Sequence, residues 1–305
     1  QVTLGAALSG SKALIKDAYL SYRRAVDAVG FKLGRSRVAF GLDPQVSSNR
    51  MDTVERPLIY GFGNFGWVGP LGMHVVGERD LGVRVDADWP RRFGAWAPFL
   101  YGAVTTGHGQ SVLPGRPMVS ARGGLARWTD TASFVRFFQF GVSAAYGRTG
   151  LERRFERYLP VGAPGDLETA PEAARTADDL GSEGRVRVLG ADAIIRLGGM
   201  AVTAEAVERR VRCRRGWGYY VTWKQRLPDL GWPAELVLRW EEAEAGYADG
   251  VHEPGRRYLA ATAGANLDVA AGWRAQINLL RLGWDGRFRD FPGAALLILQ
   301  VQALF

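Results

Sequence analysis

The stretch WGYYVTWKQRL, residues 217–227, decides the fold class of this chain. Apolar residues occupy every odd position from Trp217 to Trp223, while the even positions from Thr222 to Arg226 are polar. Successive side chains of a β-strand point to opposite faces, so a period of two sorts them into an apolar and a polar set. The stretch therefore predicts a strand with one apolar face and one charged face.

The same alternation recurs along the chain, notably in residues 233–241, 259–269 and 273–282. It predicts that six apolar residues share the outward face: Leu259, Ala261, Ile277, Leu279, Leu299 and Val301. Read from the first residue, the pattern predicts 14 strands. They span residues 1–9, 15–24, 29–37, 79–89, 95–104, 116–128, 134–147, 185–198, 199–212, 217–227, 233–245, 257–269, 273–283 and 293–305.

The apolar runs bear on whether the chain crosses a membrane. None approaches the roughly 18–20 residues that a membrane helix needs; the notable run at 294–299 is far too short. Only helices and closed barrels satisfy every backbone group in lipid, so a membrane protein of this sequence must be a barrel. We predict an all-β fold: one transmembrane antiparallel up-and-down β-barrel over residues 1–305.

The lengths of the predicted connections favour a barrel over a soluble β-sandwich. Those after even-numbered strands are short, and most of those after odd-numbered strands are longer, which is the asymmetry of outer-membrane barrels. Residues 148–184 form a long predicted extracellular loop, with a short helix expected around 171–180. Residues 38–78 are too long for a hairpin turn and contain the apolar stretches 57–60 and 62–68, so we expect them to fold inward as a constriction loop.

The carboxy-terminal residues alternate back from an aromatic end. Phe305, Ala303, Val301 and Leu299 share one face of the last predicted strand, and this pattern resembles the signal read by the barrel-insertion machinery of diderm bacteria. The chain opens on Gln1 without a basic and apolar leader, as a processed protein would. We therefore expect the bacterial outer membrane as its location.

Several segments resemble the phosphate-selective porin O/P family. They are KDAYLSY at 16–22, FKLGR at 31–35, FGL at 40–42, SSN at 47–49, ERPL at 55–58 and the closing LQVQALF at 299–305. The resemblance implies a 16-stranded homotrimeric barrel whose long third loop constricts the lumen. Two strands would then be missing ahead of Gln1, or the chain is a 14-stranded relative. The family's phosphate-selective members carry lysine-rich constrictions, whereas residues 38–78 contain no lysine.

The excess of basic residues implies anionic partners, which could be nucleic acid, anionic lipid or small anionic solutes, and does not choose among them. Lys and Arg total 39 against 31 Asp and Glu, a net charge of +8. Pores select anions by basic side chains placed where the channel is narrow. Arg50 and Arg56 in the constriction loop are the leading candidates, although Glu55 and Arg56 could equally form a pair that pins the loop. The remaining candidates on the lumen wall, which could equally be a wet lining of paired charges, are Lys32, Arg84, Arg122, Lys224, Arg226, Arg239 and Arg274.

The sequence gives little support for catalysis, metal binding or nucleic-acid binding. The single Cys213 excludes an internal disulfide, and the three histidines lie in no hydrolase or metal motif, so we predict no enzyme, cofactor or metal site. The basic cluster 209–215 could meet nucleic acid, but its place at an extracellular strand end favours lipopolysaccharide. Two functions remain: an anion-preferring diffusion porin, or a structural porin-like barrel that serves other envelope proteins.

Overall fold

A computed structural model describes most of the strand regions of the chain. The described residues are 2–9, 14–23, 28–46, 51–53, 56–60, 79–89, 95–106, 117–129, 133–150, 183–211, 214–227, 233–247, 256–270, 273–284 and 295–303. The predicted helix around 171–180, Cys213, the three histidines and the terminal Phe305 lie outside them.

Fourteen strands form one antiparallel sheet in which neighbours in sequence are neighbours in space. The strands are β1 (Val2–Ser9), β2 (Leu14–Arg23), β3 (Val29–Arg37), β4 (Arg79–Asp88), β5 (Trp96–Thr105), β6 (Met118–Trp128), β7 (Val135–Gly150), β8 (Glu183–Leu197), β9 (Met200–Val211), β10 (Arg214–Leu227), β11 (Ala234–Tyr247), β12 (Arg256–Ala270), β13 (Trp273–Trp284) and β14 (Ala295–Ala303). The prediction of an all-β, antiparallel, up-and-down fold is confirmed. The predicted strand limits differ from these by three residues at most.

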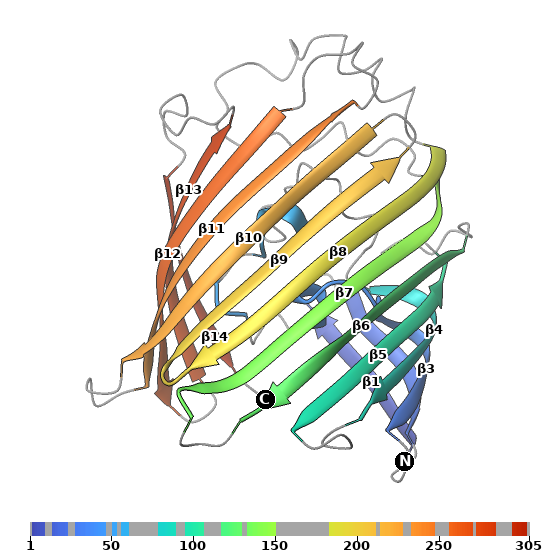
Figure 1. The fold of residues 1–305 in the computed structure, drawn as a ribbon, viewed down its shortest axis with the longest axis horizontal. Coiled ribbons are helices and arrows are strands. Elements are labelled where there is room, and N and C mark those ends of the chain that lie inside the picture. Colours follow the sequence, from blue (N-terminus) through green and yellow to red (C-terminus); the bar gives the residue numbers. More distant parts are fainter. Residues whose placement is uncertain are drawn as a thin grey trace.

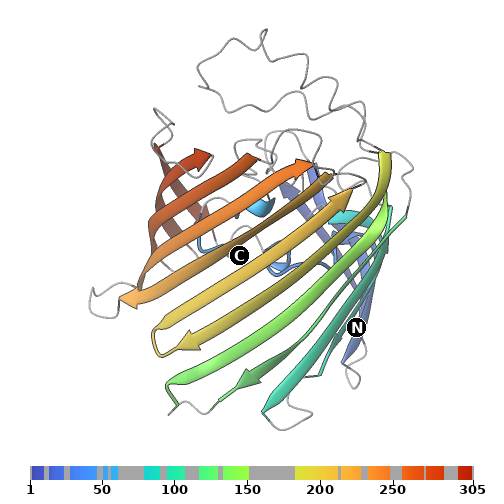
Figure 2. The same cartoon turned by 45° about the horizontal axis from the view of Figure 1, so that its top comes forward.

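The sheet is strongly curved and its strands are tilted, so that it wraps around an interior (Figures 1 and 2). No pairing joins β1 to β14 within the part of the chain that the structure describes. A closed barrel, and the two further strands that the family resemblance implies, therefore remain predictions. None of the described helices is long and apolar enough to cross a membrane.

Side chains alternate between the two faces as the sequence pattern predicts. Ile277, Leu279, Leu299 and Val301 point outward and are exposed, Leu299 by 70%. Ala261 shares their register and is half-buried. Leu259 also shares the outward register, as predicted, but only 6% of it is accessible. Leu259 lies directly opposite Glu242 on β11, and the Glu242–Arg257 ion pair occupies the same patch of the outer face.

Candidate functional site

The described residues between β3 and β4 lie on the concave side of the sheet (Figure 1). We call its described residues, 38–46, 51–53 and 56–60, the inner segment. It contains two short 3-10 helices, η1 (Asp43–Gln45) and η3 (Leu58–Tyr60). Pro44 suits the start of η1 because its fixed φ is compatible with a helical first turn. The described part of the predicted constriction loop is therefore folded inward, while residues 61–78 lie outside the description.

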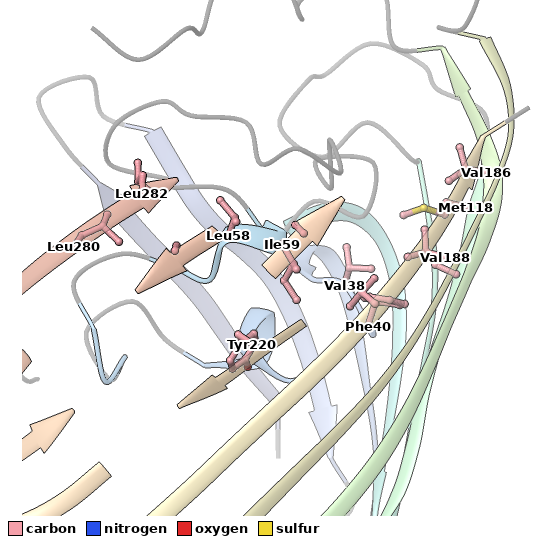
Figure 3. Close-up of a cluster of buried hydrophobic side chains, with 14 residues drawn as sticks. Val38, Phe40, Leu58, Ile59, Met118, Val186, Val188, Tyr220, Leu280 and Leu282 are labelled. Atoms are coloured by element: carbon pink, nitrogen blue, oxygen red, sulfur yellow. The ribbon is translucent and has the colours of Figure 1, made fainter. Parts of the chain in front are cut away.

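Apolar side chains attach the inner segment to the wall. Val38, Phe40, Leu58 and Ile59 are almost completely buried and form one cluster with inward residues of the strands (Figure 3). The wall side of the cluster comprises Met118, Ala145, Val186, Val188, Val207, Tyr220, Ala243, Ala260, Leu280 and Leu282. A predominantly polar inner face thus carries an apolar patch where the inner segment covers it, and burying that patch holds the segment in place.

Glu205 on β9 is a buried anchor for both ends of the inner segment. Its Oε1 accepts hydrogen bonds from the Leu42 amide at 2.9 Å and the Tyr60 hydroxyl at 2.5 Å. Its Oε2 accepts from the Asp43 amide at 3.2 Å and from the Tyr220 hydroxyl at 3.1 Å. Desolvation, and then the neighbouring Glu205, raise the pKa of Tyr60 well above its ordinary value, so this hydroxyl stays protonated as a donor.

Gly41 is required for this approach. Its φ is +66°, in the left-handed region, and an added Cβ would lie 2.1 Å from the Tyr60 hydroxyl and 2.6 Å from Glu205 Oε1. Side chains disfavour that backbone conformation, and here they would also collide with the anchor. The Gly41 amide donates to Ser143 Oγ of β7 at 3.0 Å, which adds another contact with the wall.

A second buried carboxylate, Glu241 on β11, anchors η3. It accepts a hydrogen bond from the Leu58 amide and one from Arg239 Nε, the latter at 2.7 Å. Arg239 in turn donates to the Thr53 hydroxyl and to the Arg56 carbonyl. Arg239, a predicted anion-path residue, therefore holds the inner segment and is not displayed to a passing solute.

Polar side chains of β10, β12 and β13 hold the middle of the inner segment. Asn266 Nδ2 donates to the Asp52 carbonyl at 2.9 Å, and Gln276 Nε2 donates to the Met51 carbonyl at 3.1 Å. Lys224 Nζ lies 2.6 Å from Asp52 Oδ1. The inner segment is thus fastened along the wall from β7 to β13.

Arg56, a predicted anion-path residue, is held within the inner segment. Arg56 is only 5% exposed and pairs with Asp43, while it also donates to the carbonyls of Asp43 and Val46. A guanidinium that is buried away from water needs partners of this kind. Arg56 therefore joins the second part of the inner segment to the first part, at Asp43 and Val46. The observed ion pair of Arg56 is with Asp43, and the anion-path role and the Glu55 pair both stay predictions. Arg50 and Glu55 lie outside the described residues.

The other predicted basic residues point inward, and most of them are paired with acids. Arg122 forms a double hydrogen bond with Asp192, at 2.7 and 3.1 Å, in a buried site. Lys32 and Arg84 share Asp86, and Arg84 also donates to Gln45 of η1. Arg226 approaches Glu235, and Arg274 pairs with Asp268. These inward bases therefore lie beside acids, and their part in an anion path stays a prediction.

The anchoring carboxylates Glu205 and Glu241 are the residues that sequence reasoning missed as functional. Alternation places both on the inward face, but their partners come from a segment more than 140 residues away. In the described part of the chain, no group of three or more His, Cys, Asp or Glu side chains could hold a metal ion.

Comparison with known proteins finds similar structures but no similar sequences. No protein-family model and no curated protein matches the chain. Its structure is similar to that of outer-membrane expressed OmpT of Vibrio cholerae, with a TM-score of 0.51 and 9% identity over 88% of this chain and 70% of that one. A BenF-like porin from Pseudomonas fluorescens Pf-5 gives a TM-score of 0.40 and 8% identity over 94% and 78%. At such identity the first likeness shows the fold alone.

Proposed function

We propose that this chain is an outer-membrane porin through which small solutes diffuse passively. The observation that carries the proposal is the polarity of the sheet. Large apolar side chains such as Leu33, Leu238 and Leu299 are exposed on its outer face, while the inner face is lined by ion pairs and amides. A soluble barrel has the opposite polarity, whereas a membrane barrel faces lipid outside and water inside. The likeness to an outer-membrane protein supports the same location.

The solute path runs beside the inner segment, past the inward charged side chains that stay exposed. The inner segment contacts strands β6 to β13 and also Arg84 of β4. The inward residues Asp80, Arg84 and Ala103 are buried, whereas some charged side chains near the strand ends stay exposed. Arg23 and Asp88 there have 58% and 35% of their side chains exposed, and the side chain of Lys32 is 31% exposed. These are the charged groups that a hydrated solute meets.

A modest anion preference is the finer part of the proposal. It rests on the net charge of +8 and on the exposed inward arginines Arg23, Arg196 and Arg226. Most inward bases are paired with acids, which cancels much of their field. The described inward lysines Lys32 and Lys224 both contact carboxylates, so phosphate-like anions would pass as one class of small anion among others.

Planar-bilayer recording of the purified full chain tests the proposal. We expect stepwise ion conductance, and a reversal potential in a salt gradient that indicates a small preference for anions. Arg23→Gln with Arg226→Gln should reduce that preference, since both side chains are mostly exposed. Arg210→Gln, on the outer face, is the matched control. A folded, inserted protein that conducts no ions would contradict the proposal.

A structural porin-like barrel is the second candidate. It is favoured by one observation: the inner segment buries inward residues on strands as far apart as β6 and β13, which fills part of the interior. Such a protein would insert without conducting and would purify with another envelope protein. The homotrimer implied by the family resemblance is tested in the same preparation by its mass in detergent.

A further inference from the structure

Three outward-facing arginines lie directly opposite one another on three adjacent strands. Arg187 on β8 pairs with Arg210 on β9, and Arg210 pairs with Arg215 on β10. All three side chains are exposed. We call Arg187, Arg210 and Arg215 the arginine row. It differs from the basic cluster seen in the sequence, because alternation turns Arg209 to the inner face and brings in Arg187 from a neighbouring strand.

The arginine row is short of negative charge. Like charges directly opposite on a sheet repel. Glu208 is the acid of this patch, with Oε1 at 2.6 Å from Arg210 Nε and 3.0 Å from Arg215 Nε. Arg187 has no acidic partner among the residues that the structure describes. Three guanidinium groups against one carboxylate leave a net charge of +2 on an exposed outer face.

The row lies at a defined height above an apolar band. The outward residues next along β10 are Trp217 and Tyr219, whose rings stack with centroids 6.3 Å apart. Beyond them come Val221 and Trp223, and on β9 the residues Ala206, Ala204 and Val202. Stacked aromatics are typical of the membrane–water interface. The row lies two residues past Trp217, about 7 Å further along the strand, which is the level of lipid headgroups.

We infer that the arginine row binds the phosphate groups of an anionic glycolipid in the outer leaflet, of the diphosphorylated lipid A type. Guanidinium groups match phosphate oxygens in a bidentate manner. A phosphate seated across the row would relieve the repulsion between its members and give Arg187 a counter-ion. The inference rests on the outer-membrane location in the proposed function.

The test measures retained lipid on the full chain. Wild type and the triple variant Arg187→Gln, Arg210→Gln, Arg215→Gln are reconstituted into phosphatidylcholine vesicles that contain lipid A with both phosphates or lipid A without them. After a detergent wash, mass spectrometry counts the lipid A bound per chain. We expect the triple variant to retain about tenfold less phosphorylated lipid A, because it lacks the guanidinium groups that pair with the phosphates.

The matched control is Arg127→Gln with Arg136→Gln, two exposed arginines near the opposite ends of their strands. It should retain lipid A like wild type. The single variant Arg187→Gln breaks no described ion pair, so it reports binding even if the triple variant folds poorly. The inference would be overturned if wild type retained lipid A that lacks phosphates as well as it retains the phosphorylated form. It would also be overturned if both row variants retained as much phosphorylated lipid A as wild type, or if the variants lost their oligomers while their bound lipid stayed the same. Conductance of the same vesicles tests the porin proposal separately.

Discussion

Two parts of the inner wall carry the same kind of ion pair in very different surroundings. Arg122 and Asp192 lie beside the Glu205 anchor, with 4% and 1% of their side chains exposed. Arg23 and Asp88 are the last residues of β2 and β4, with 58% and 35% of their side chains exposed. The residue types and the inward register are the same. The two pairs differ in their exposure to solvent, because the first lies beside the inner segment and its anchors. That exposure determines how much each pair contributes to the free energy of folding.

The difference follows from solvation. An exposed pair is screened by water and contributes about 0–1 kcal/mol. When one member of a buried pair is removed, the other is left as an uncompensated charge, at a cost of about 3–5 kcal/mol. We therefore expect covered residues of the wall to determine stability and the open residues to determine what passes. Four variants test this division, from the largest expected effect to the smallest.

Phe40→Ala should cause the largest loss. Phe40 is fully buried between the inner segment and the wall. Truncation of a buried Phe costs about 3–5 kcal/mol, measured here as the free energy of unfolding in urea with the protein in detergent. Phe140→Ala is the control, since Phe140 is 46% exposed on the outer face. Equal losses from the two variants would mean that the inner segment contributes nothing to stability.

Asp192→Asn should cost on the order of 3 kcal/mol, because it leaves the Arg122 guanidinium buried without a counter-charge. The same urea titration measures it. Since Asp192 also lies opposite Glu205 on β9, a repeat in the Glu205→Gln background shows whether the two buried acids are coupled. A loss below about 1 kcal/mol would place this pair with the exposed ones.

Arg56→Ala should loosen the inner segment and leave selectivity nearly unchanged. It removes the ion pair with Asp43 and the donation to Val46, and hydrogen bonds to charged groups contribute about 1.5–3 kcal/mol. We expect faster proteolysis within residues 38–60 at an unchanged reversal potential. A shifted reversal potential with normal protease resistance would restore Arg56 as a residue of the solute path.

Arg23→Gln should have the smallest effect on stability, within about 1 kcal/mol, because its pair with Asp88 is exposed. Its effect should appear in the reversal potential and fade in concentrated salt, where the Debye length falls to about 3 Å. A stability loss as large as that of Asp192→Asn would erase the distinction between the two parts of the wall.

Much of the fold could be predicted from local sequence because strands carry their own signal. The alternation in residues 217–227 and 273–283 depends only on which face each side chain occupies, so strand limits and the inward set of bases followed directly. The role of Arg56 did not. Whether an arginine reaches water or a carboxylate depends on where its segment is placed, and Asp43 is 13 residues away in a segment without repeating pattern.

The sequence by itself determined the all-β antiparallel order, the inward and outward sets and the inward path of the segment after β3, because period-two alternation and apolar composition are local properties. Only the tertiary structure decided which charged side chains are exposed to solvent and which are buried. Glu205, Glu241 and Arg239 are ordinary inward residues in the sequence, and contacts with a distant segment turn them into anchors. Leu259 shows the same limit on the outer face: the strand pattern predicts its outward direction, but not its burial beside the Glu242–Arg257 pair.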